Sequence, residues 1–126
     1  IKAIRCYFEG HDLEEVQTPI LQICPVIDTH IRAFDTDLRG IDGQIQDRLY
    51  LHTSPELAMK KLLVAGMDRI YQICPVFRNA EHSKRHRPEF TMIEWYRSEA
   101  DYYDIMHDCE ELLRACAKAA NRPTTP

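Results

Sequence analysis

The chain has 126 residues, of which 44% are hydrophobic and 29% are charged, and its formal net charge is −4 at pH 7. This length fits one domain or part of one, and the composition is ordinary for a globular protein. The negative net charge excludes a protein that binds nucleic acid through a surface that is basic as a whole, so any anion site must be a local patch.

No apolar run approaches the ~18 residues that a membrane-spanning helix needs, and we recognise no signal peptide. The five cysteines form no CxxC pair, and the six histidines lack the spacing of metal ligands. We therefore expect reduced cysteines in the core, no metal site within this chain, no membrane contact and a cytoplasmic protein. The cysteines are Cys6, Cys24, Cys74, Cys109 and Cys116.

The first part of the chain predicts a helix over residues 1–8, ended by Gly10, and then a strand over residues 13–21. Residues 22–48 carry scattered apolar positions and several aspartates, so we expect mostly loop there, with a short strand or two. The stretch "RLYLHT", residues 48–53, predicts a strand.

The next element is a helix over residues 54–66. Ser54 is expected to cap it, Pro55 suits the first helical position, and Gly66 suits the residue just past the end. Its apolar stripe consists of Met59, Leu62 and Leu63.

Two strands, residues 69–77 and 89–97, frame a charged loop and predict an antiparallel hairpin. Hairpin loops usually have about two to five residues, so a loop of about ten suggests a function. A helix over residues 102–120 follows, with Asp101 as its cap. Its predicted apolar stripe consists of Tyr102, Ile105, Met106, Cys109, Leu112, Leu113 and Cys116.

The strand over residues 89–97 places Phe90, Met92, Glu94 and Tyr96 on one face, because side chains alternate along a strand. A carboxylate on a core face is costly unless it is paired. On a ligand-binding face, Glu94 can hold an amine while an aromatic ring stacks on a base. The alternative is that this face lies in solvent.

The charged loop predicts contacts with phosphate. Arg78 ends the first strand of the hairpin, and arginine suits bidentate contact with phosphate oxygens. Lys84, Arg85, His86 and Arg87 add charge that could neutralise a triphosphate or the end of a nucleic acid. A solvated hairpin tip is the alternative.

Glu56 lies in the first turn of the helix over residues 54–66, where the helix dipole alone favours a carboxylate. Neither GxGxxG nor GxxxxGK[ST] occurs in the sequence. Nucleotide binding would therefore use contacts other than a glycine-rich phosphate loop.

Residues 53–97, "TSPELAMKKLLVAGMDRIYQICPVFRNAEHSKRHRPEFTMIEWYR", resemble the catalytic core of class II lysyl-tRNA synthetases. The likeness is strongest to their relatives that attach lysine or β-lysine to elongation factor P without tRNA. The motif "TSPE" favours this branch of the family. "FRNAE" followed by "PEFTMIEWY" is similar to class II motif 2, at about 70–97. "YFEGHDLEEVQTPIL" is similar to motif 1, at about 1–21, with Pro19 as its characteristic proline.

This resemblance implies an α+β fold, an antiparallel sheet flanked by helices, with residues 1–126 as the N-terminal part of the catalytic domain. It implies lysine or β-lysine as substrate, ATP and Mg²⁺ as cofactors, elongation factor P or alternatively tRNA(Lys) as acceptor, and a homodimer. The reaction would have two steps. The lysine carboxylate attacks the α-phosphate of ATP, and the adenylate then passes its acyl group to an amine or a tRNA hydroxyl.

The resemblance also implies roles for individual residues. Arg78 would hold the α-phosphate as the catalytic residue, and Phe90 would stack on adenine. The other ATP-binding residues would be Asn79, Ala80, Glu81, His86 and Arg87. The substrate lysine would be bound by Ser54, Pro55, Glu56, Glu94 and Tyr96.

The sequence departs from the family pattern at Ala80, where a glutamate is usual, and at Arg87, where an asparagine is usual. Glu81 also matches a glutamate of the elongation factor P branch and can serve in its place. Arginine cannot accept a hydrogen bond as asparagine can, so we expect Arg87 to contact ATP differently, for example at a phosphate. Motif 3, which carries a second ATP-binding arginine, is not among these residues. We therefore expect them to be inactive alone, and a non-catalytic dimerisation paralogue is a third alternative.

Overall fold

The computed structural model describes residues 1–24, 28–80 and 83–121. Within them, three helices accompany two sheets of three strands each, which is the α+β class that the sequence predicts. The elements are α1 (Lys2–Glu9), β1 (Glu14–Glu15), β2 (Leu21–Gln22), β3 (Asp35–Arg39), β4 (Ile45–Leu51), α2 (Glu56–Val64), β5 (Arg69–Phe77), β6 (Glu89–Arg97) and α3 (Tyr102–Ala119).

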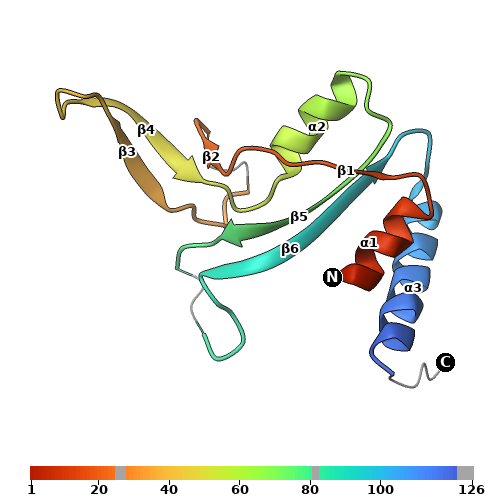
Figure 1. Cartoon of the computed structure of the whole chain (residues 1–126). Helices are drawn as coiled ribbons and strands as arrows, with labels where there is room; N and C mark the ends of the chain where they lie inside the picture. Colours follow the sequence, from red (N-terminus) through yellow and green to blue (C-terminus); the bar gives the residue numbers. More distant parts are fainter. Residues whose placement is uncertain (25–27, 81–82, 122–126) are drawn as a thin grey trace.

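The two sheets have the strand orders β1–β5–β6 and β2–β4–β3. Figure 1 shows α1 and α3 beside each other on one side of the first sheet and α2 on the opposite side. The β3–β4 hairpin extends away from the rest of the molecule. The β5–β6 hairpin is the longest strand pair, and it runs antiparallel from Arg69↔Arg97 to Phe77↔Glu89, with both strands bounded as predicted.

Hydrophobic clusters lie on both faces of the first sheet, and this fixes which way each β6 side chain points. Trp95 packs on the α1–α3 side and Tyr96 packs on the α2 side, as alternation along a strand requires. The first cluster contains the buried residues Tyr7, Phe8, Leu13, Tyr71 and Leu112. The second contains the buried residues Val16, Met59 and Ile70.

The predicted strand over residues 13–21 is wrong. Its ends form two short strands, β1 and β2, that belong to different sheets, and the chain crosses from one sheet to the other between them. Pro19 lies in this crossing, and a proline has no N–H to donate to a strand partner. Apolar residues occur on both sides of the crossing. A single continuous strand would give the same pattern in the sequence, so the pattern could not distinguish the two arrangements.

The stretch over residues 22–48 contains more regular structure than predicted, because β3 and β4 pair as a hairpin and β4 begins at Ile45. Its turn is closed by a bond from the Gly40 N–H to the Gln44 carbonyl at 2.9 Å. Gly43 has a φ of 78°, which a glycine adopts without strain. Both strands are largely exposed, so they lack the alternation that would reveal them in the sequence.

Helix α2 begins one residue later than predicted. Pro55 is its N-cap, and Ser54 precedes the cap, although the Ser54 Oγ accepts the N–H of Glu56 at 3.0 Å. Gly66 follows the end of the helix with a φ of 99°, as expected of the residue after a C-cap. The predicted stripe is correct, since Met59 is buried and Leu62 and Leu63 pack beside it.

Helix α3 begins where the sequence predicts, because Asp101 and Asp104 form a capping box. The Asp101 carboxylate accepts the N–H groups of Tyr103 and Asp104, and the Asp104 carboxylate accepts the Asp101 N–H at 2.9 Å.

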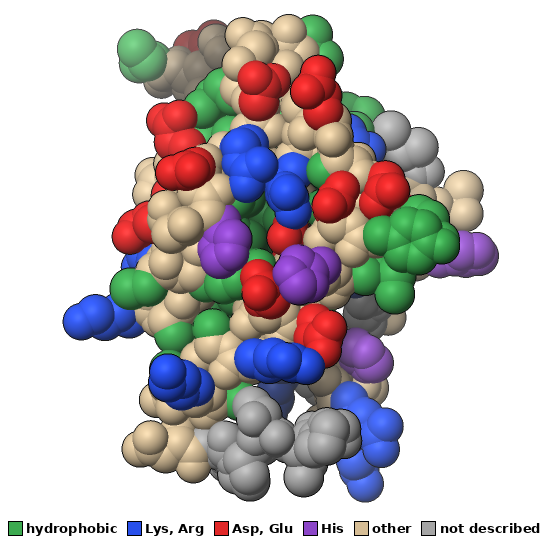
Figure 2. Space-filling model, turned by 90° about the vertical axis from the view of Figure 1, so that its right-hand side faces the viewer, with side chains coloured by type: hydrophobic (Ala, Val, Ile, Leu, Met, Phe, Trp, Pro, Cys, Tyr) green, Lys and Arg blue, Asp and Glu red, His purple; other side chains and the backbone are tan. Residues whose placement is uncertain are grey.

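The predicted apolar stripe of α3 is wrong in part, because Tyr102, Met106 and Leu113 are exposed. Helix α1 packs on α3 along a narrower strip, which contains the buried Leu112 and the buried Asp108. Figure 2 shows the side where α1 and α3 lie, with basic, acidic and histidine side chains interspersed.

None of the five cysteines forms a disulfide in the structure, and the prediction that all of them lie in the core is wrong. Cys74 is buried, Cys109 and Cys116 are half-buried, and Cys6 and Cys24 are exposed. Among the described residues, no helix is both long and apolar enough to cross a membrane.

Candidate active site: an acidic pocket between α2 and the β5–β6 hairpin

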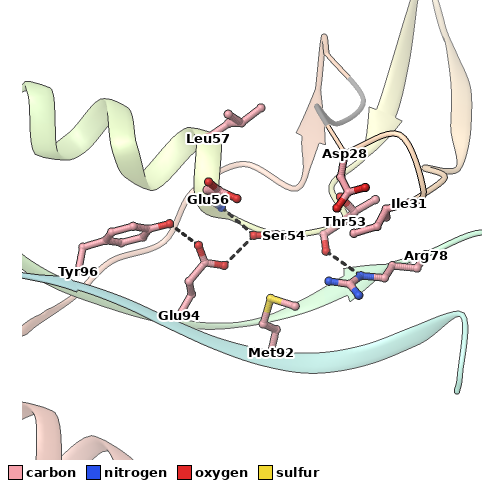
Figure 3. Close-up of a pocket in the computed structure, with 10 residues that line it drawn as sticks. All are labelled: Asp28, Ile31, Thr53, Ser54, Glu56, Leu57, Arg78, Met92, Glu94 and Tyr96. Carbon is pink, nitrogen blue, oxygen red and sulfur yellow. Dashed lines mark hydrogen bonds between the residues drawn. The ribbon is translucent and has the colours of Figure 1, made fainter. Parts of the chain in front are cut away.

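A cavity of about 570 Å³ opens on the side of the sheet that α2 covers. Its walls come from the loop before β3, the loop before α2, the first turn of α2 and the end of β5. The last wall is the face of β6 that carries Met92, Glu94 and Tyr96 (Figure 3). The lining residues are Asp28, Ile31, Thr53, Ser54, Glu56, Leu57, Arg78, Met92, Glu94 and Tyr96.

Glu94 is the centre of a hydrogen-bond network at one end of this pocket. Ser54 Oγ donates to one carboxylate oxygen at 2.6 Å, and the Tyr96 hydroxyl donates to the other at 2.5 Å. Ser54 Oγ also accepts the N–H of Glu56, which fixes its orientation. Two hydroxyl groups thus hold the Glu94 carboxylate toward the cavity (Figure 3).

Burial raises the pKa of Tyr96 well above its ordinary value, and the hydrogen bond to Glu94 and the charges of Glu94 and Glu56 raise it further. The phenol therefore remains a neutral donor at any physiological pH. Because the neutral phenol adds no charge of its own, the pocket presents its carboxylates to a cationic ligand.

Glu56 lines the pocket from the first turn of α2, and its carboxylate accepts a bond from Lys60 Nζ at 2.6 Å. This contact and the charge of Glu56 raise the pKa of Lys60. Both side chains are about half exposed, so the ion pair between Lys60 and Glu56 is weak.

Arg78 lies at the other end of the pocket. Its Nε donates to the Thr53 carbonyl at 3.4 Å, and its guanidinium carbon lies 5.4 Å from the centre of the Phe90 ring. Phe90 is half-buried and is outside the pocket lining, so the structure joins it to the site through Arg78.

The remaining residues predicted for ATP binding lie along the loop after β5. Asn79 donates its N–H to the Arg32 carbonyl at 2.7 Å, and its side chain accepts the Ala80 N–H at 2.9 Å. His86 Nδ1 lies 2.9 Å from Ser83 Oγ, and His86 is exposed. Arg87 is exposed as well, and Glu81 lies outside the described residues.

Ala80 has a φ of 62°, in the left-handed region that residues with a Cβ rarely adopt. Backbone strain of this kind is often found at functional sites, where the surrounding structure maintains it.

Of the residues predicted to bind lysine, Ser54, Glu56, Glu94 and Tyr96 line the pocket, whereas Pro55 is fully buried behind the start of α2. Sequence reasoning missed the lining residues Asp28, Ile31, Thr53 and Leu57. Met92 was placed on the correct face without a role. Asp28 stands in a stretch without periodicity, so no local signal marked it.

The pocket combines three carboxylates, those of Asp28, Glu56 and Glu94, with one guanidinium, that of Arg78. This arrangement suits a ligand with ammonium groups and one anionic group, because charge-assisted hydrogen bonds are the strong ones in proteins. Within the described ranges, no group of three or more His, Cys, Asp or Glu side chains could hold a metal ion.

A family model described as class II tRNA synthetases (D, K and N) matches residues 1–125. The chain is 44% identical over 122 residues to the elongation factor P--(R)-beta-lysine ligase of Photobacterium profundum, covering 94% of this chain and 38% of that protein. Proteins of the same name are 46% identical over 114 residues in Mannheimia succiniciproducens and 42% identical over 126 residues in Vibrio campbellii.

These two matches cover 90% and 98% of this chain. The chain spans only 35 to 39% of the length of these three relatives.

Proposed function

This chain belongs to the class II tRNA synthetase family, and we propose that the protein containing it activates lysine or β-lysine with ATP and transfers the acyl group to a lysine side chain of elongation factor P. The names of the three relatives described above support this acceptor. In the proposal, residues 1–126 are the N-terminal part of the catalytic domain, with motif 1 at about 1–21 and motif 2 at about 70–97.

The observation that carries the proposal is the Glu94 network. A carboxylate held by the hydroxyls of Ser54 and Tyr96 is pre-organised to accept hydrogen bonds from an ammonium group. Arg78 lies at the opposite end of the same pocket, where it suits a phosphate or a carboxylate. A lysine-type substrate fits between them, with its distal amine at Glu94 and its carboxylate toward Arg78.

In the first step, a carboxylate oxygen of the substrate attacks the α-phosphorus of ATP. The bond from that phosphorus to the bridging oxygen breaks, and pyrophosphate leaves with the electron pair. Arg78 neutralises charge that develops on the α-phosphate, and Phe90 provides a ring on which adenine stacks. Mg²⁺ bound to the ATP phosphates would screen their charge, and within the described residues no cluster of carboxylates or histidines would hold it independently of ATP.

In the second step, an amine nitrogen of the acceptor attacks the carbonyl carbon of the adenylate. The bond from that carbon to the phosphate oxygen breaks, AMP leaves with the electron pair, and the nitrogen loses a proton. Neither step needs a covalent nucleophile from the protein, so positioning and charge account for catalysis.

The test uses a protein of the relatives' full length, because this chain spans little more than a third of them. We expect lysine-dependent or β-lysine-dependent exchange of pyrophosphate into ATP, followed by acyl transfer to purified elongation factor P. Transfer to tRNA(Lys) in place of elongation factor P would favour a lysyl-tRNA synthetase. A protein that neither binds lysine nor exchanges pyrophosphate would favour a non-catalytic dimerisation paralogue.

We propose that the protein acts in the cytoplasm, which the absence of a recognised signal peptide in the sequence led us to expect. We also propose a homodimer, which sedimentation of the full-length protein can test.

A further inference from the structure

His52 is a buried histidine that lies between the two sheets, and only 2% of its surface is exposed. It is the first residue after β4, at the start of the loop that leads to α2. Its N–H donates to the Ile20 carbonyl, next to β2, and its carbonyl accepts the N–H of Phe77 at the end of β5, both at 3.0 Å. One residue therefore joins the end of β5 in the first sheet to the second sheet.

The imidazole ring of His52 makes a further bond to the same end of β5. Its Nε2 lies 2.7 Å from the Pro75 carbonyl, and because a carbonyl only accepts, Nε2 carries the hydrogen and donates it. Pro75 has no N–H, so another strand could not pair regularly with β5 at this point. Within the described residues the other ring nitrogen, Nδ1, is buried without a hydrogen-bond partner, so the ring is held through Nε2.

These bonds fix two supports of Arg78. Phe77, whose N–H is bonded to the His52 carbonyl, directly precedes Arg78 in the chain. Thr53, which directly follows His52, is buried, and its carbonyl accepts a bond from Arg78 Nε at 3.4 Å (Figure 3). The backbone that carries the guanidinium and the carbonyl that it contacts are therefore held relative to each other at His52.

The direction of the guanidinium matters if Arg78 neutralises charge on the α-phosphate. A misplacement of about 1 Å in a group that acts on the reacting atoms can lower a rate about 100-fold. The bond from Arg78 to the Thr53 carbonyl is already long at 3.4 Å, so a small displacement of Thr53 would break it.

We propose that His52 is a positioning residue for the α-phosphate site. Its imidazole holds the Pro75 carbonyl, which keeps Thr53 within reach of Arg78 and directs the guanidinium at the phosphate. Because His52 is buried, it acts through Arg78 and does not contact the nucleotide. This inference rests on the proposed function, which assigns the α-phosphate to Arg78.

Three substitutions separate the hydrogen bond of His52 from the volume of its side chain. His52→Leu fills much of the same space but cannot donate. His52→Gln places an amide nitrogen near the position of Nε2 and keeps a donor for the Pro75 carbonyl. His52→Asn also has an amide, but this amide ends near the position of Nδ1 and does not reach Pro75. His52→Asn therefore replaces His52→Leu as the test if the leucine variant does not fold.

His11 offers a matched control. Its Nδ1 lies 2.7 Å from the Tyr7 carbonyl, so it also makes a bond from an imidazole ring to a backbone carbonyl. Tyr7 belongs to the cluster on the side of the sheet where α1 and α3 pack, and His11 is outside the pocket lining. His11→Leu therefore removes a comparable bond away from Arg78.

The experiment is calorimetric titration of the full-length protein with AMP and with adenosine, which lacks the α-phosphate. The ratio of the two dissociation constants measures the preference for AMP, which is the contribution of the phosphate. His52→Leu and His52→Asn should lower this preference about tenfold, while adenosine binding stays within about threefold of wild type. His52→Gln and His11→Leu should keep the preference within about threefold of wild type.

A second cycle tests whether His52 acts through the guanidinium. In an Arg78→Met background, His52→Leu should not lower the preference for AMP any further, because the group that it positions is gone. A further loss in that background would overturn the inference. So would a wild-type preference in His52→Leu, or a loss in His52→Gln as large as the loss in His52→Leu.

Lysine-dependent pyrophosphate exchange on the same samples separates this inference from the proposed function. A preference for AMP that depends on His52, without any exchange, would contradict the proposed function and uphold the role of His52. Exchange by a protein whose preference for AMP does not depend on His52 would do the reverse. A wild-type protein that binds neither AMP nor adenosine would contradict both.

Discussion

Glu94 is a carboxylate on a sheet face that α2 covers, where an unpaired charge is costly. Ser54 and Tyr96 reduce this cost with one hydrogen bond to each carboxylate oxygen. Alternation along β6 was enough to place Glu94 and Tyr96 on one face from the sequence. The partnership with Ser54 was not predictable by periodicity, because it joins residues 40 positions apart.

Ala80 gives the first prediction at this scale. Its φ of 62° is strained for any residue with a Cβ, so Ala80→Gly should raise the free energy of unfolding by up to about 1 kcal/mol. Urea denaturation of the full-length protein measures the change.

Ala65→Gly is the matched control, since Ala65 ends α2 with a φ of −78°. Glycine there relieves no strain and should lower the free energy of unfolding by about 0.5 to 1 kcal/mol. Equal losses in both variants would mean that the backbone at Ala80 is not strained in solution.

At the scale of elements, α3 is attached to the sheet by an ion pair between the half-buried Arg97 and the buried Asp108. Arg97 Nη1 donates to Asp108 Oδ1 at 2.7 Å, and the two side chains are 20% and 8% exposed. Asp108→Ala leaves the half-buried guanidinium without its carboxylate and should lower the free energy of unfolding by about 2 to 3 kcal/mol.

Glu110→Ala serves as the comparison on the same helix, because Glu110 pairs with Arg114 in solvent. Thermal unfolding should show a loss of less than about 0.5 kcal/mol for this variant. A similar small loss for Asp108→Ala would show that the contact between α3 and β6 does not depend on the ion pair.

Tyr71 connects the central strand to alkaline stability. Burial is the largest cause that raises the pKa of Tyr71, from 10 to about 12. The negative charge of Glu15 and the hydrogen bond to Glu15 also raise it. Below pH 10 the phenol is neutral in both the folded and the unfolded chain. Between pH 10 and 12 the unfolded chain loses the proton first, so the native state loses stability as pH rises.

Tyr71→Phe removes this dependence and should reduce the slope of unfolding free energy against pH above pH 10 by up to about 1.4 kcal/mol per pH unit. It should also cost about 1 kcal/mol at pH 7, because the bond to Glu15 is lost. Denaturant titrations between pH 9 and 12 measure the slope, with Tyr103→Phe, at an exposed position of α3, as the control. Parallel curves for Tyr71→Phe and the parent protein would rule out the effect.

The elements that the sequence predicted well are those whose determinants are local. β5 and β6 have the predicted bounds because their apolar and β-branched runs end at charged loops, and α3 begins at a capping residue. The prediction of one strand over residues 13–21 was wrong because β1 and β2 pair in different sheets. Only contacts with distant parts of the chain decide this pairing. The place of Asp28 in the pocket was not predicted for a similar reason, because the pocket is assembled from segments far apart in the chain.

At the scale of the whole molecule, one sheet separates the side on which α1 and α3 pack from the side that carries the candidate site. Helices α1 and α3 pack with the cluster around Phe8 and Tyr71, and α2 encloses the acidic pocket on the other face. The account's central claim is that the Glu94 carboxylate binds the distal amine of a lysine-type substrate for activation by ATP.

Lysine-dependent pyrophosphate exchange in the full-length wild-type protein and its Glu94→Gln variant tests this claim most directly. Glutamine keeps the size of the side chain and removes its charge, so kcat/KM for lysine should fall at least about 100-fold while the KM for ATP stays within about threefold. Glu110→Gln, at an exposed position of α3, should behave as wild type. A Glu94→Gln variant that uses lysine as well as the wild type does would contradict the account.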